Sequence, residues 1–175
     1  TKSYTFQIQG STAPATPVIP PTTPASPDGP TVTEWAKSYV KEAAAVGLIA
    51  DSLGNDFQKR ITRAQFAATT VKLYEAMGGE KIVTTGESPF SDTDDPAALQ
   101  AAAAGFVNGV GGGRFSPNAE VSREQAAVML SAVYTKLGGK VPIVAATEFS
   151  DDSSVSGYAK SAVAFMADKG IINGV

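Results

Sequence analysis

Apolar residues recur at helical spacing in several segments of the chain, and glycine-containing loops separate these segments. The spacing predicts a first helix from about Thr33 to Val46, with Gly47 at its C-terminal end. Further helices are expected over roughly 63–77, 96–104 and 123–137, and after residue 151. The predicted inner faces are Trp35, Tyr39, Ala43 and Val46; Phe66, Thr70, Leu73 and Met77; Ala126, Leu130, Val133 and Leu137; and Tyr158, Ala162, Phe165 and Met166. The predicted fold class is therefore all-α.

The N-terminal part of the chain follows different patterns. Residues 3–9 alternate apolar and polar side chains, which is typical of a half-buried β-strand. Residues 1–10 are accordingly expected to be either the end of a preceding β domain or a disordered tail. Residues 11–32 are rich in proline and threonine, a composition that predicts an extended linker between modules. The alternative for this linker is a ligand for a proline-binding domain.

Composition excludes several classes of function. The chain has no cysteine and no histidine, so it lacks disulfides, thiolate metal sites and the commonest general base. A net charge of −3 gives no general reason to expect nucleic acid as a partner, and no apolar run is long enough for membrane insertion. Asp92, Asp94 and Asp95 could form a carboxylate cluster for calcium or acid–base chemistry, but acidic residues before a helix are usually caps. We therefore expect no enzyme activity, cofactor or metal.

One segment of the chain returns almost unchanged. Ile61–Ala67 reads I-T-R-A-Q-F-A, and Val121–Ala127 reads V-S-R-E-Q-A-A; each is followed by a helix that closes on a pair of glycines. Phe90 and Phe149 each begin an F-S-D sequence. These matches predict three units, at residues 33–80, 88–140 and 147–175, of which the third lacks its loop and second helix. We also expect the chain to be a fragment of something longer.

Helix initiation explains most of the repeated segment. Thr62 with Gln65, and Ser122 with Gln125, have the spacing of a capping box. Arginine at the first helical position is not explained, because its charge lies beside the positive end of the helix dipole. One hypothesis is that Arg63 and Arg123 combine with free first-turn amides to bind a carboxylate or phosphate. The alternatives are an ion pair with Asp92, Asp151 or Glu120, or no partner.

Together these motifs resemble the S-layer homology family of bacterial surface proteins, whose units usually occur in threes. The resemblance covers about residues 33–175. It is carried by Phe90-Ser91-Asp92, Trp35, Gly105–Gly109, Gly113–Pro117, the two arginine segments, Phe149-Ser150-Asp151 and Gly170–Gly174. It implies a pseudo-threefold all-α bundle that binds secondary cell-wall polymer, typically a pyruvylated polysaccharide, in grooves between units.

The resemblance also implies roles for individual residues. Arg63 and Arg123 match the arginine that meets the acidic sugar. The implied supporting residues are Gln65, Glu124 and Gln125 around the arginines, and Asn108, Gly109, Asn173 and Gly174 in the loops. Trp35 could stack on a sugar face, although its place in an apolar stripe favours a core position.

Two functional hypotheses follow. The first is non-catalytic anchoring of a secreted protein to the cell wall or S-layer of a bacterium, with the export signal outside this sequence. The second is structural assembly, in which other copies of the chain complete the third unit and build a surface array or filament.

Overall fold

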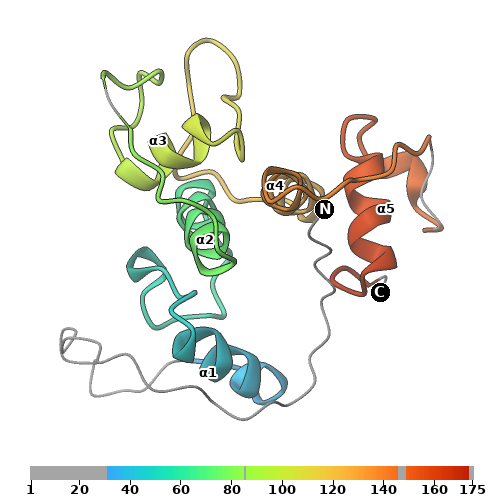
Figure 1. The fold of residues 1–175 in the computed structure, drawn as a ribbon. Helices are drawn as coiled ribbons and strands as arrows, with labels where there is room; N and C mark the ends of the chain where they lie inside the picture. The colour runs from blue at the N-terminus through green and yellow to red at the C-terminus, as the bar shows by residue number, and fades with distance from the viewer. Residues whose placement is uncertain (1–30, 85, 146–148, 174–175) are drawn as a thin grey trace.

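The computed structural model describes residues 31–84, 86–145 and 149–173 (Figure 1). Its helices are α1 (Lys37–Ala45), α2 (Arg63–Ala76), α3 (Pro96–Ala103), α4 (Arg123–Lys136) and α5 (Lys160–Asp168). Three short 3-10 helices, η1 (Glu34–Ala36), η2 (Asp51–Leu53) and η3 (Asp152–Ser154), lie in the connections. Within the described ranges there is no β-strand, so the all-α prediction is confirmed.

The predicted N-terminal strand and most of the proline-rich linker, together with Gly174, lie outside the described residues. None of the described helices is long and apolar enough to cross a membrane.

Local signals determine where the helices begin. The predicted capping boxes are both present. The backbone amide of Gln65 donates to Thr62 Oγ1 at 3.3 Å, and the backbone amide of Gln125 donates to Ser122 Oγ at 3.3 Å. Asp95 caps α3 by accepting hydrogen bonds from the first-turn amides, with Pro96 at the first helical position. These caps satisfy donors that a helix start leaves unpaired.

The two glycine pairs end α2 and α4 in the same way. Gly78 and Gly138 have positive φ values of 89° and 91°. A residue in this left-handed conformation ends a helix, and glycine adopts the conformation at little steric cost. Gly79 and Gly139 lie against the rings of Tyr74 and Tyr134, where an added Cβ would collide with the ring. Each pair therefore holds one tyrosine against the end of its own helix.

Two helix pairs repeat along the chain. α2 packs on α3, α4 packs on α5, and α2 packs on α4, so that α4 lies between α2 and α5 (Figure 1). The first core joins α2, α3 and α4 around Phe106 and Phe115, which are at most 2% exposed. The second core joins α4 to α5 around Phe165 and Met166.

The predicted inner face of α5 is confirmed at Ala162, Phe165 and Met166, which are buried. The buried faces of α2 and α4 include the predicted Thr70 and Val133 but otherwise differ from the predicted ones. α2 buries Ala67, Thr70, Val71 and Tyr74, whereas Phe66 and Leu73 are half-buried. In α4, Met129 and Val133 join the first core and Ala127 joins the second. Both helices contact two neighbours, so their buried arc is wider than the single stripe that the sequence predicts.

Most of the predicted inner face of the first helix, now divided between η1 and α1, is exposed, and only Ala43 is half-buried. Trp35 is 76% exposed, and Tyr39 and Val46 are also exposed. The physical reason is that α1 makes no contact with another described α-helix comparable to the contacts among α2–α5. The expectation that Trp35 is a core residue is therefore wrong for the described structure.

Candidate functional site

Arg63 lies at the first position of α2 and reaches into the loop of the following unit. Its Nη2 donates a hydrogen bond of 2.5 Å to the backbone carbonyl of Asn108. Its guanidinium carbon lies 5.2 Å from the centre of the Phe115 ring, a cation–π distance. Phe115 is fully buried, so the ring provides a fixed floor beneath the guanidinium.

Arg123 makes the same contact one unit later. It lies at the first position of α4, and its Nη2 donates to the backbone carbonyl of Asn173 at 2.6 Å. The structure thus brings each predicted arginine to the predicted asparagine of the next unit. Each asparagine contributes its carbonyl, and this contact does not depend on its side chain.

Neither arginine forms an ion pair with a described carboxylate. Glu120 pairs with Arg60 at 2.9 Å, and Asp92 lies 3.7 Å from Arg114, so neither takes the role that the ion-pair alternative gave it. Burial lowers the pKa of Arg63 from its ordinary value, an effect opposed by Tyr158, but an arginine side chain stays protonated in proteins. Both positive charges are therefore left without a carboxylate in the described structure.

The first-turn amides differ between the two helices. In α2, the Arg63 amide donates to Ala119 O at 2.8 Å and the Ala64 amide donates to Pro117 O at 3.0 Å. The expectation that free first-turn amides join the arginine is therefore wrong at α2. Carbonyls of the loop that precedes α4 accept hydrogen bonds from both of these amides. In α4, the Arg123 and Glu124 amides have no acceptor among the described residues.

The glutamines beside the arginines hold the backbone. Gln65 accepts a hydrogen bond from the Thr62 amide at 2.9 Å, and its Nε2 donates to Ser52 O at 2.7 Å. Gln125 accepts from the Ser122 amide at 3.3 Å. These contacts give both glutamines a structural role next to the arginines.

Glu124 connects the second unit to the third. Its carboxylate accepts hydrogen bonds from the Ser156 amide at 2.8 Å, from Ser156 Oγ at 3.0 Å and from the Tyr158 hydroxyl at 3.3 Å. Burial and Glu124 raise the pKa of Tyr158, whereas Arg63 lowers it by a smaller amount. Tyr158 is 64% exposed, so the third unit presents an accessible aromatic ring whose hydroxyl is bonded to Glu124.

Tyr158 was missed as a candidate site residue. The signal for it is in the sequence, because Tyr158-Ala159-Lys160-Ser161 repeats the pattern of Trp35-Ala36-Lys37-Ser38. Trp35 itself makes no cation–π contact with either arginine in the described part of the chain.

Loop packing accounts for Asp92 and Gly109. Asp92 accepts hydrogen bonds from the Phe115 amide at 2.7 Å and the Ser116 amide at 2.9 Å, which lower its pKa. A Cβ at Gly109 would lie 2.9 Å from Arg114 O and 3.2 Å from the Phe90 ring. The described residues contain no group of acidic side chains placed to hold a metal ion, so the carboxylate-cluster alternative gains no support.

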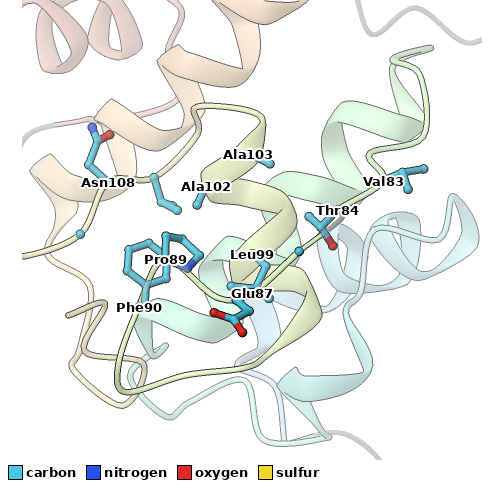
Figure 2. A pocket seen from close by; sticks show the side chains of 12 residues that line it. Val83, Thr84, Glu87, Pro89, Phe90, Leu99, Ala102, Ala103 and Asn108 are labelled. Atoms are coloured by element: carbon cyan, nitrogen blue, oxygen red, sulfur yellow. The ribbon is translucent and has the colours of Figure 1, made fainter. Parts of the chain in front are cut away.

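A cavity of about 490 Å³ opens beside Asn108 and Gly109. Figure 2 shows Pro89 and Phe90 on one side of it, with Leu99, Ala102 and Ala103 of α3 facing the same space. Arg63 does not line this cavity, although it is bonded to the Asn108 carbonyl at the cavity edge.

Comparison with known proteins agrees with this architecture. The sequence model of the S-layer homology domain family matches residues 89–127 and 148–175 of the chain. The chain is 33% identical over 152 residues to exoglucanase XynX of Acetivibrio thermocellus, with 80% of this chain and 13% of the enzyme covered. It is 34% identical over 137 residues to an endoglucanase of Bacillus sp. (strain KSM-635), with 75% and 14% covered. It is 30% identical over 148 residues to an amylopullulanase of Thermoanaerobacterium thermosulfurigenes, with 80% and 8% covered.

The chain is a modular all-α repeat protein built of repeated helix pairs. In each pair a capped helix begins with an arginine whose side chain reaches the loop of the next unit. The chain belongs to the S-layer homology family, whose domains occur in bacterial cell-surface proteins anchored to the cell wall. The domain itself is not catalytic. Because the chain spans only a small part of each relative, the activities of those enzymes are not assigned to it.

Proposed function

We propose that this chain anchors its parent protein to the cell wall by binding an acidic, pyruvylated secondary cell-wall polysaccharide through Arg63 and Arg123. One observation carries the proposal. Both arginines are fixed by a carbonyl of the next unit, and neither is neutralised by a described carboxylate. A positive charge that is held in place without a protein carboxylate to neutralise it is suited to an anionic ligand.

The Arg63 site offers more than charge. Its Nε is buried and has no hydrogen-bond partner in the described structure. Leaving such a donor unpaired costs about 1–3 kcal/mol, and because this atom is buried, a ligand carboxylate would meet the guanidinium through its other nitrogens. The exposed Tyr158 ring, whose hydroxyl is bonded to Glu124 beside Arg123, would provide a surface for the apolar face of the sugar.

The two sites would bind the anion differently. At Arg63 the guanidinium, which lies over the buried Phe115 ring, would act without the first-turn amides, because these amides are already bonded. At Arg123 the amides of Arg123 and Glu124 are available beside the side chain. Gln65, Gln125, Glu124, Asn108 and Asn173 then support the sites by positioning backbone.

The decisive experiment compares the polymer with and without its acidic groups. Purified secondary cell-wall polymer is titrated into the protein by calorimetry before and after mild acid hydrolysis of the pyruvyl ketals. Binding should fall by about tenfold or more when the carboxylates are removed, which corresponds to the loss of about 1.4 kcal/mol. Equal affinity for the two polymers would contradict recognition through the arginines.

The second candidate function, assembly with other copies in a surface array, is favoured by α1. Trp35 of η1, Tyr39 of α1 and Val46 just after α1 form a stripe that is exposed in the described structure. If copies associate through this stripe, sedimentation should show an oligomer that Trp35→Ala dissociates. A monomer for both proteins would argue against assembly and leave anchoring unaffected.

A further inference from the structure

Backbone pairing joins Thr31 to the loop that precedes α2. The Thr31 amide donates to Asn55 O at 2.8 Å, and the Phe57 amide donates to Thr31 O at 3.1 Å. These two hydrogen bonds form a parallel β-bridge between Thr31 and Asp56. This pairing, the Thr31 clamp, closes residues 32–55 into a loop that contains η1, α1 and η2.

The parallel direction of the clamp decides how it carries tension. Tension that enters through the residues before Thr31 pulls Thr31 toward its N-terminal side, whereas α2 holds Asp56 and Phe57 from their C-terminal side. In a parallel pair these two pulls are opposite and run along the strand direction, so both hydrogen bonds are loaded together. The pull therefore passes from Thr31 directly to Phe57 and α2, and α1 carries none of it while the clamp is closed.

α1 has little resistance of its own. It has nine residues, and isolated helices shorter than about 12–15 residues are marginal in water. It lies apart from α3, α4 and α5, and it packs on no described α-helix as closely as α2–α5 pack on one another (Figure 1). η2 is held more firmly, because Gln65 Nε2 donates to Ser52 O at 2.7 Å and the preceding Ala50 is buried. A pull that opens the clamp would therefore extend residues 32–50 and stop at η2.

We propose that the Thr31 clamp and α1 form a mechanical fuse, in which the clamp opens first and α1 extends while α2–α5 stay folded. This inference rests on the proposed anchoring function, because a wall anchor carries tension between the wall and its parent protein. Fully extended, residues 32–50 span about 65 Å, a length that relieves tension before it reaches the arginines. Arg63 keeps its contacts with Asn108 O and the Phe115 ring, because neither lies in the extended segment.

Two matched variants test the clamp. Thr31→Pro removes the amide that donates to Asn55 O, because proline has no backbone N–H, and it keeps the carbonyl of residue 31. Thr31→Val is the control, because it keeps this amide and changes only an exposed side chain. Circular dichroism checks that both variants retain the parent helix content.

The full chain is held by its two ends in optical tweezers, without polysaccharide. The parent and Thr31→Val should show a first extension of about 60 Å, at a force that leaves α2–α5 folded. At the same force, this first extension should occur about fivefold faster in Thr31→Pro, because one of the two hydrogen bonds is absent. The later unfolding steps should be the same in all three proteins.

The outcomes separate this inference from the anchoring proposal. A first extension of clearly different length in the parent, or equal opening rates for Thr31→Pro and Thr31→Val, would show that the fuse is wrong. Because the measurement contains no polysaccharide, that result leaves anchoring unaffected. Conversely, if the polymer titration contradicts recognition through the arginines, the predicted first extension still stands as a property of the chain.

Discussion

Gln65 and Gln125 occupy equivalent positions in their units but make different contacts. Gln65 bonds to the Thr62 amide at 2.9 Å and to Ser52 O at 2.7 Å, which ties α2 to η2. Gln125 bonds only to the Ser122 amide among the described residues, at 3.3 Å. Gln65→Ala therefore removes two side-chain hydrogen bonds, whereas Gln125→Ala removes one longer hydrogen bond.

The difference can be estimated from these bonds. A typical intramolecular hydrogen bond contributes about 0.5–1.5 kcal/mol net. Gln65→Ala should therefore lower the free energy of unfolding by about 1–3 kcal/mol. Gln125→Ala should lower it by about 0.5–1 kcal/mol, because its bond is long and more exposed.

Urea unfolding followed by circular dichroism measures both variants against the parent. The comparison is valid if the dependence of unfolding free energy on urea is unchanged. Equal losses for the two variants, or a larger loss for Gln125→Ala, would refute the argument from the bonds of Gln65. Polymer binding by folded Gln65→Ala should match the parent, which separates a structural role from contact with the sugar.

Three further substitutions test the loops that hold the arginines. The Phe115 amide lowers the pKa of Asp92, so this carboxylate stabilises the loop above its unfolded pKa of about 3.9, and the contribution is lost as pH falls through the lowered pKa. Amide exchange at Phe115 should therefore accelerate in acid in the parent, and Asp92→Asn should remove that pH dependence. Gly109→Ala should destabilise the protein by about 1–3 kcal/mol through overpacking against Arg114 O, as measured by thermal unfolding; an unchanged midpoint would contradict this. Glu124→Ala should release the third unit and speed proteolysis there, whereas cleavage at the parent rate would show that these bonds are dispensable.

Features with local signals could be predicted from the sequence. The helices, both capping boxes and the Asp95 cap depend on residues a few positions apart, and the structure places them as expected. The exposed face of α1 could not be predicted, because an apolar stripe does not show whether a partner helix is present. The buried face of α2 differs from the predicted stripe because two helices, α3 and α4, contact α2.

The candidate site was only partly predictable. The arginines were identifiable because their charge opposes the helix dipole, but their acceptors are backbone carbonyls, which any residue carries. The occupied first-turn amides of α2 depend on a loop from the next unit, so no local pattern indicates them. Tyr158 could have been found by aligning the third unit with the first around Trp35.

The central claim is tested most directly by binding to purified cell-wall sacculi. The double variant Arg63→Ala/Arg123→Ala is compared with Arg60→Ala/Arg114→Ala, which removes the same charge from two exposed arginines that face carboxylates. The first variant should bind at least about tenfold more weakly than the parent, a loss of about 1.4 kcal/mol, and the second should bind within about twofold of it. Parent-like binding by the first variant, or equal weakening of both, would contradict polysaccharide recognition by Arg63 and Arg123.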